Sequence, residues 1–117
     1  MPHCIIEQSA DLAEHSAAFL SGVHQTVCDS ELFDLDSVKS RLRVYEAFCA
    51  GAEAAPESFV HVTIKLLQGR SAEQKKLLAA AVVCHLSGLG LPSGVSLTTD
   101  IVDMDAVAYA KYIMPTE

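Results

Sequence analysis

Three arginines are the side chains of this sequence best suited to bind an anion. Arg41 and Arg43 lie in one short stretch, and Arg70 follows later in the chain. A guanidinium presents five N–H donors in a planar fork, which can hold a carboxylate through two parallel hydrogen bonds. Residues 1–38 contain seven acidic residues and no lysine or arginine, whereas the remainder contains eight acidic and eight basic residues. The scarce arginines beside this acidic segment are therefore candidates for a local anion site.

The spacing of cysteines and histidines argues against a metal site. Four cysteines, Cys4, Cys28, Cys49 and Cys84, form no CxxC pair, and the five histidines form neither an HxxxH nor an HExxH pattern. The segment 88–90 (Gly-Leu-Gly) follows a predicted helix, whereas a dinucleotide-binding turn follows a strand. We expect no metal and no other cofactor, and we expect each cysteine to be a small buried hydrophobe.

Length and composition predict one globular domain over residues 1–117. Half of the residues are apolar and 20% are charged, and no apolar run approaches the ~20 residues of a membrane span. The start Met1-Pro2-His3 lacks the features of a signal peptide, so a cytoplasmic protein is expected. The net charge of −7 argues against nucleic acid or an anionic membrane as a partner.

Hydrophobic periodicity predicts a β-α-β unit in the first half of the chain. A strand is expected at 3–7, a helix from an N-cap at Ser9 to about Cys28, a loop at 29–36 and a second strand at 38–48. The positions expected to carry the apolar face of the helix are Leu12, Ala13, Ala17, Leu20, Val23, His24 and Val27.

The second half repeats this order after a loop at 51–57. Alternating apolar residues predict a strand at 59–66, and residues 71–74 (Ser-Ala-Glu-Gln) form the sequence of a capping box at the start of a helix. That helix is expected to end at 88–90, and a fourth strand is expected at 94–103. The helix positions expected to face the core are Leu77, Leu78, Ala81, Val82, His85 and Leu86.

Two β-α-β halves predict an α/β (α+β) fold with a four-stranded mixed sheet. Right-handed crossovers would place both helices on one face of that sheet. The face opposite the helices would be semi-polar, with Arg41, Arg43, His61, Thr63 and Lys65 on it. Such a face is usually covered by another subunit, so we expect an oligomer.

Three motifs resemble one protein family. The start Pro2-His3-Cys4-Ile5-Ile6-Glu7-Gln8-Ser9 is similar to Pro-His-Phe-Ile-Val-Glu-x-Ser, and Arg41-Leu42-Arg43-Val44 is similar to Arg-x-Arg-Val. Residues 59–66 and 69–71 resemble Phe-Val-His-x-x-Leu-Lys-Ile-Gly-Ala-Gly-Arg-Ser. In this order and spacing, which cover most of residues 2–86, the motifs resemble the 5-carboxymethyl-2-hydroxymuconate isomerases of the tautomerase superfamily.

The resemblance implies a homotrimer, a role in aromatic catabolism and an isomerase mechanism that uses the N-terminal proline. Met1 would be removed, and the Pro2 amine would move a proton between carbons of an unsaturated keto or enol diacid. Arg41 would be the principal substrate-binding residue, with Arg43 and Arg70 as further candidates. The segment 109–113 (Tyr-Ala-Lys-Tyr-Ile) departs from the family's Tyr/Phe-Lys-x-Asn-Asn ending, which makes the substrate less certain than the superfamily.

The implied chemistry has a physical basis in the state of the proline nitrogen. An N-terminal amine has a pKa closer to neutrality than lysine, and burial or neighbouring cations lower that pKa further. While Met1 is attached, however, the Pro2 nitrogen is part of a tertiary amide and is not basic. The Met-free form is therefore predicted to be the active one.

Structural roles compete with these functional ones. Arg41 and Arg43 could pair with glutamates at a subunit contact, and Arg70 could stabilise the start of a helix. His3 and Glu7 could orient the N-terminus. Two other functions also fit: a different tautomerase or hydratase reaction of the same superfamily, or a non-catalytic trimeric homologue if Met1 is retained.

Overall fold

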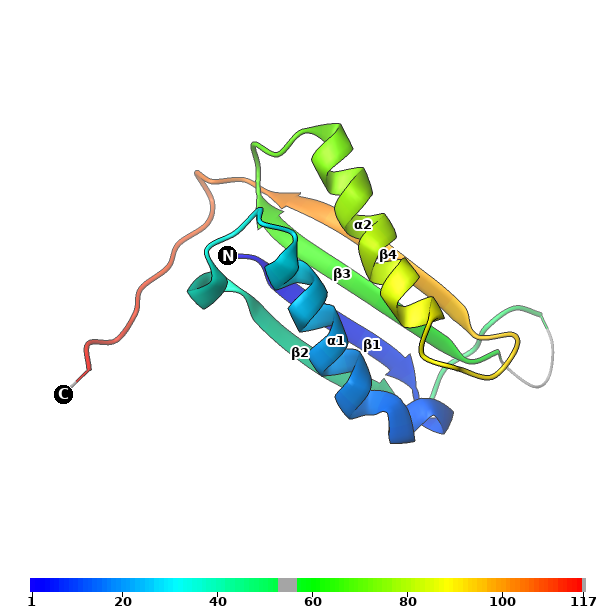
Figure 1. Ribbon diagram of the computed structural model, residues 1–117. Helices are drawn as coiled ribbons and strands as arrows, with labels where there is room; N and C mark the ends of the chain where they lie inside the picture. Colours follow the sequence, from blue (N-terminus) through cyan, green and yellow to red (C-terminus); the bar gives the residue numbers. More distant parts are fainter. Residues whose placement is uncertain (53–56, 117) are drawn as a thin grey trace.

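A computed structural model describes residues 1–52 and 57–116 and contains a four-stranded mixed sheet with two helices (Figure 1). The elements are β1 (His3–Ser9), α1 (Ser16–Asp29), β2 (Lys39–Tyr45), β3 (Phe59–Leu67), α2 (Ala72–Ser87) and β4 (Ser96–Met104). The strand order is β2-β1-β3-β4, with β1 parallel to β2, antiparallel to β3, and β3 parallel to β4. The predicted pair of β-α-β halves is confirmed.

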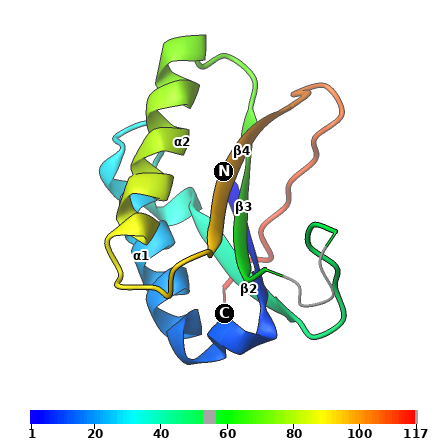
Figure 2. The same ribbon diagram turned by 90° about the vertical axis from the view of Figure 1, so that its right-hand side faces the viewer.

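Both helices lie on the same face of the sheet, as predicted. Figure 2 shows α1 and α2 on one side of the strands and the chain that follows β4 on the other side. The register places Lys39, Arg41, Arg43 and Tyr45 of β2 on the face turned away from the helices. Within the part of the chain that the structure describes, no helix combines the length and apolarity needed to cross a membrane.

Alternating residues of the two central strands form the core together with one stripe of each helix. The fully buried side chains include Ile6, Val60, Val62, Ile64, Leu66, Phe19, Val23, Val27, Val82 and Leu86. Burial of a side chain of this size contributes roughly 1.5–3 kcal/mol to folding. This layer holds the sheet against the helices and leaves the opposite face for other contacts.

The apolar stripe of the first helix differs from the prediction. Phe19 is fully buried, whereas Leu20 is 37% exposed and Ala13 and Ala17 are exposed. The reason is a 3-10 helix, Ala10–His15, which precedes α1. A 3-10 helix has three residues per turn instead of 3.6, so it shifts the residues that face the sheet.

Ser9 lies at the predicted N-cap position, directly before the 3-10 helix Ala10–His15, but its side chain does not cap the helix. The Ser9 side chain makes no capping hydrogen bond to the helix, and its hydroxyl oxygen accepts a hydrogen bond from the Phe59 amide at 3.1 Å. Ser9 is buried at the end of β1, beside the start of β3. Its hydroxyl therefore joins two strands, because the antiparallel pairing of β1 with β3 places the Phe59 amide within hydrogen-bond distance.

Several predicted boundaries also shift. The strand predicted at 38–48 spans Lys39–Tyr45, and the strand predicted at 94–103 spans Ser96–Met104. The loop predicted at 29–36 contains the start of a short 3-10 helix, Leu35–Ser37. Four residues of the loop predicted at 51–57, residues 53–56, lie outside the described part of the chain.

The expectation that all four cysteines are buried is confirmed for one of them. Cys4 is buried in the core and Cys28 is partly buried against it. Cys49 and Cys84 are exposed, because Cys49 follows the end of β2 and Cys84 lies on the outer face of α2. Burial raises the pKa of the Cys4 thiol to about 11, so this thiol stays protonated at neutral pH.

The capping box of α2 provides a test of local stability. The Ser71 hydroxyl accepts from the Gln74 amide at 3.1 Å, and the Gln74 side-chain oxygen accepts from the Ser71 amide at 2.8 Å. We expect Ser71→Ala to lower the free energy of unfolding by about 1 kcal/mol, because one helix amide loses its partner. Urea unfolding at fixed protein concentration measures this change. Ser21→Ala, at an exposed position of α1, is the control, and equal midpoints for both variants would contradict the prediction.

Candidate active site

The N-terminus lies where β1 and β2 begin side by side. The Pro2 carbonyl accepts a hydrogen bond from the Lys39 amide at 3.1 Å, and the Met1 amino group donates to the Ser37 carbonyl at 2.8 Å. Pro2 itself is buried. These backbone contacts hold the bond between Met1 and Pro2 in a defined place at the end of the sheet where β1 and β2 begin.

A chain of side-chain contacts leads from β2 to the N-terminal methionine. Arg41 Nη1 lies 3.2 Å from His3 Nδ1, and His3 Nε2 lies 3.2 Å from the Tyr109 hydroxyl. The same hydroxyl donates to the Met1 sulfur at 2.9 Å. The His3 and Tyr109 rings meet edge to face with centroids 6.2 Å apart. Three segments distant in sequence, the N-terminus, β2 and the chain after β4, therefore meet at one point.

The surroundings of this point are cationic. Burial, with the charges of Lys39 and Lys111, lowers the pKa of the Met1 amine below its usual value. Burial, followed by the charge of Arg41, also lowers the pKa of His3. Both shifts favour the neutral amine and the neutral imidazole. The site thus combines positive charge, which attracts an acid, with basic groups that lose their protons more readily than free ones do.

Arg43 lies on the same face but farther from the N-terminus. It stands two residues beyond Arg41 on β2 and is in register with Glu7 of β1. The Glu7 carboxylate accepts a hydrogen bond from the Tyr45 hydroxyl, and this bond raises the pKa of Tyr45. Arg43 therefore stands beside a carboxylate of its own chain.

Arg70 holds two backbone segments together. Its guanidinium donates to the Leu32 carbonyl at 2.8 Å and to the Leu67 carbonyl at 3.3 Å, and it lies 4.8 Å from the centroid of the Phe33 ring. Its charge contributes to the lowered pKa of the Met1 amine. The structure thus places Arg41 against His3, the residue that follows Pro2, and gives Arg70 contacts typical of a structural residue.

Tyr109 is the residue of this site that the sequence did not reveal. It belongs to the tail after β4 and has no periodic pattern around it. Its one signal is an aromatic side chain at the point where the sequence departs from the family ending. Its contacts with Met1 and His3 span more than 100 residues of sequence and depend on the path of the tail.

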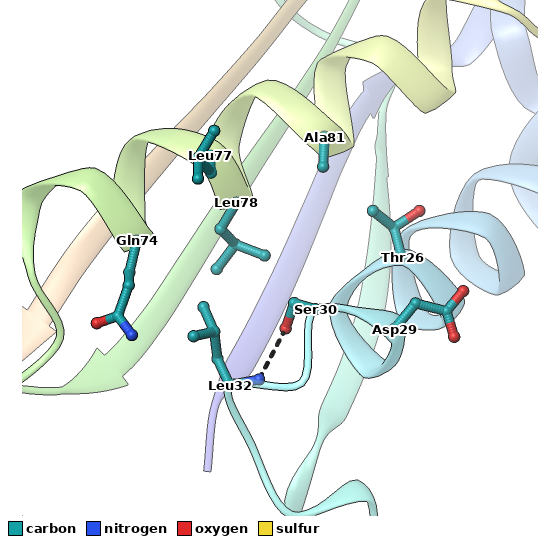
Figure 3. A pocket seen from close by; sticks show the side chains of 8 residues that line it. All are labelled: Thr26, Asp29, Ser30, Leu32, Gln74, Leu77, Leu78 and Ala81. Carbon is teal, nitrogen blue, oxygen red and sulfur yellow. Dashed lines mark hydrogen bonds between the residues drawn. The ribbon is translucent and has the colours of Figure 1, made fainter.

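A separate cavity of about 390 Å³ lies in the helix layer (Figure 3). It is lined by Thr26, Asp29, Ser30, Leu32, Gln74, Leu77, Leu78 and Ala81. The hydroxyls of Thr26 and Ser30 already donate to carbonyls of α1, at 2.8 and 2.6 Å. None of the predicted site residues lines this cavity, which is on the opposite side of the sheet from Arg41. Among the described residues, no group of three or more histidines, cysteines and acids is placed to hold a metal.

Comparison with known proteins agrees with this fold. The model of the 5-carboxymethyl-2-hydroxymuconate isomerase family matches residues 2–111. A solved 5-carboxymethyl-2-hydroxymuconate isomerase from Deinococcus radiodurans R1 is similar at 20% identity with a TM-score of 0.81, over 95% of this chain and 88% of that chain. A 5-carboxymethyl-2-hydroxymuconate delta-isomerase is similar at 14% identity with a TM-score of 0.77, over 97% and 89% of the two chains.

A third similar structure is described as a fused 4-OT wild-type asymmetric trimer, with 20% identity and a TM-score of 0.75 over 93% of this chain and 91% of that chain. No curated protein matches the sequence. At these identities the solved structures establish the fold, whereas the family model covers nearly the whole sequence. The chain therefore belongs to the 5-carboxymethyl-2-hydroxymuconate isomerase family.

Proposed function

We propose that this protein is a cytoplasmic tautomerase, of the 5-carboxymethyl-2-hydroxymuconate delta-isomerase type, that acts on small unsaturated oxo- or hydroxy-diacids. The observation that carries the proposal is the position of Pro2, which is buried where Lys39, Lys111 and Arg70 act on the N-terminus and where the next residue, His3, contacts Arg41. After removal of Met1, the Pro2 nitrogen becomes a secondary amine at this place. A buried amine among cations is a base suited to neutral pH.

In the proposed reaction, the Pro2 amine removes a proton from a carbon adjacent to the conjugated system of the diacid. The electrons of the C–H bond move into that system and form a dienolate. The protonated amine then returns the proton to a different carbon, so the substrate is isomerised and the base is regenerated. No cofactor is needed for this step, because the same group carries the proton in both directions.

Arg41 is proposed to bind a substrate carboxylate. One of its N–H groups is directed at His3, and a guanidinium has five, so others are free to form a charge-assisted pair. Arg43, about 7 Å farther along the same face at two residues of strand, is a candidate for the second carboxylate. Arg70 is proposed to act through its charge and its loop contacts, since two of its N–H groups hold backbone carbonyls.

A homotrimer is proposed on the basis of the exposed face and tail. The sheet face opposite the helices carries charged and polar side chains, and the tail exposes Val107, Tyr112, Ile113 and Met114 by 72% or more. Apolar side chains clustered in one tail are typical of a surface that another subunit covers.

We expect light scattering at micromolar concentration to give about three times the chain mass of 12.5 kDa. The physical reason is the burial of the exposed tail and of the polar sheet face in subunit contacts. Truncation after Asp105 should shift the protein toward smaller species, since it removes the apolar tail. A full-length chain that remains monomeric under these conditions would rule out the trimer.

The proline mechanism predicts activity that depends on processing of the N-terminus. We expect the Met-free form to ketonise enolic diacids and the Met1-bearing form to be inactive, because an amide nitrogen is not basic. The kcat/KM of the Met-free form should rise with pH as the amine loses its proton, with a midpoint below the value of ~8 for a free terminus. Ultraviolet assays of enol decay measure both effects, with each preparation identified by intact mass. Equal rates in the two forms would remove Pro2 from the mechanism, and equal turnover of monoacids and diacids would contradict the substrate class.

The proposed carboxylate pair predicts a specific defect for Arg41→Ala. Loss of a charge-assisted hydrogen bond should lower kcat/KM for an enolic diacid by about tenfold or more. Lys76→Ala, which removes an exposed cation of α2, is the charge-matched control and should leave kcat/KM unchanged. If both variants behave like the parent enzyme, Arg41 does not bind substrate.

A further inference from the structure

The Tyr109 hydroxyl occupies a position that the proposed proline mechanism does not yet use. It donates to the sulfur of Met1, the residue bonded to the Pro2 nitrogen, at 2.9 Å. Tyr109 is also half-buried, and its ring packs edge to face against His3. A hydrogen-bond donor is thereby held against the side chains of Met1 and His3, the two residues that flank Pro2.

The chemistry of the donors determines the direction of every hydrogen bond in this cluster. An arginine N–H can only donate, so His3 Nδ1, 3.2 Å from Arg41 Nη1, must accept and carries no proton. A neutral imidazole with an acceptor at Nδ1 carries its proton at Nε2. His3 Nε2 therefore donates to the Tyr109 oxygen at 3.2 Å, which leaves the tyrosine proton for the Met1 sulfur.

This direction of donation makes the Tyr109 hydroxyl, the last donor of the chain, a stronger donor. Each hydrogen bond in a chain polarises the next one, so a hydroxyl that accepts a bond becomes a better donor. The charge on Arg41 is at the far end of the chain and reinforces this polarisation. The burial and the arginine charge that lower the pKa of His3 keep its imidazole neutral, as the bonding pattern requires.

The weak acceptor at the end of the chain is lost when Met1 is removed. A thioether sulfur is a poor acceptor, whereas a dienolate oxygen carries much of the negative charge formed in the reaction. A substrate bound at the Pro2 amine would bring its own oxygens into the region that the methionine side chain occupies. The Tyr109 hydroxyl would then have a far stronger acceptor.

We propose that Tyr109 is a catalytic residue whose hydroxyl donates a hydrogen bond to the developing dienolate oxygen, and that His3 and Arg41 position and polarise it. This inference rests on the proposed proline mechanism and adds the group that stabilises its intermediate. The Pro2 amine takes the carbon-bound proton and later returns it. Tyr109 keeps its own proton throughout, so the step requires no additional acid.

The test compares Met-free variants in the ultraviolet assay with an enolic diacid. Tyr109→Phe removes one oxygen atom and should lower kcat by about 100-fold, the typical effect of losing one donor to a developing oxyanion. The KM should change by less than about threefold, because the hydrogen bond from Tyr109 becomes strong only when negative charge develops on the dienolate oxygen, after the substrate has bound. Tyr112→Phe, at an exposed tyrosine of the same tail, is the matched control and should retain the parent kcat.

A double-mutant cycle tests the chain of donors. His3→Ala should lower kcat about tenfold alone but add little in the Tyr109→Phe background, since residues that act through one another are not additive. His3→Gln, whose amide N–H can replace Nε2, should recover part of the loss. Nitrogen NMR of His3 should show the tautomer protonated at Nε2, in the Met1-bearing form as well.

The outcomes separate this inference from the function on which it rests. An inactive Met-free parent overturns the proline mechanism and this role with it. An active parent with an unchanged Tyr109→Phe variant overturns the role of Tyr109 and leaves the proline mechanism intact. A Tyr109→Phe variant with a raised KM and an unchanged kcat would also contradict the proposal. So would additive losses of kcat in the double variant of His3 and Tyr109.

Discussion

The parallel pairing of β1 with β2 is the contact on which the candidate site depends. It places His3 opposite Lys39 and Ile5 opposite Arg41, so the arginine lies diagonally across from the histidine on the same face. A long side chain can bridge this diagonal, and Arg41 Nη1 reaches His3 Nδ1. A slip of one residue would turn Arg41 toward the helices and separate it from the N-terminus.

The two faces of the sheet divide structural and chemical roles. The helix-facing side chains of β1 and β3, such as Ile6 and Val62, are fully buried and supply most of the folding free energy. Side chains on the opposite face are not part of this core, so charged groups can lie there. An apolar layer beneath the site also reduces solvation of the N-terminus, which lowers the pKa of the amine in the same direction as the cations do.

The tail after β4 completes the site from the far end of the chain. It crosses to the side of the sheet that the helices leave uncovered (Figure 2). Its inner residue, Tyr109, contacts Met1 and His3, while outer residues such as Ile113 remain exposed. One short segment thus joins the proposed catalytic group to the proposed subunit contact, which makes the site sensitive to assembly.

The sequence alone determined the fold class, the helix-facing residues of the central strands and the position of Arg41 on the opposite face of the sheet. These features follow from local periodicity and from short motifs, because alternation along a strand decides which face each side chain occupies. The same reasoning placed Leu12, Val23 and Val27 in the core correctly but missed Phe19, which follows a 3-10 helix with fewer residues per turn. It also gave the Ser9 hydroxyl the wrong partner, since this hydroxyl accepts a hydrogen bond from Phe59 of β3.

Only the tertiary structure decided the contacts of Arg70 and Tyr109. Arg70 lies in a family-like motif, yet its partners are the Leu32 and Leu67 carbonyls, and no local pattern specifies them. Tyr109 reaches the N-terminus through the path of a tail without regular structure. The sequence determines contacts that repeat with the period of a strand or helix. Contacts between distant segments depend on how the whole chain packs, because the burial and the partners that set their energies exist only after folding.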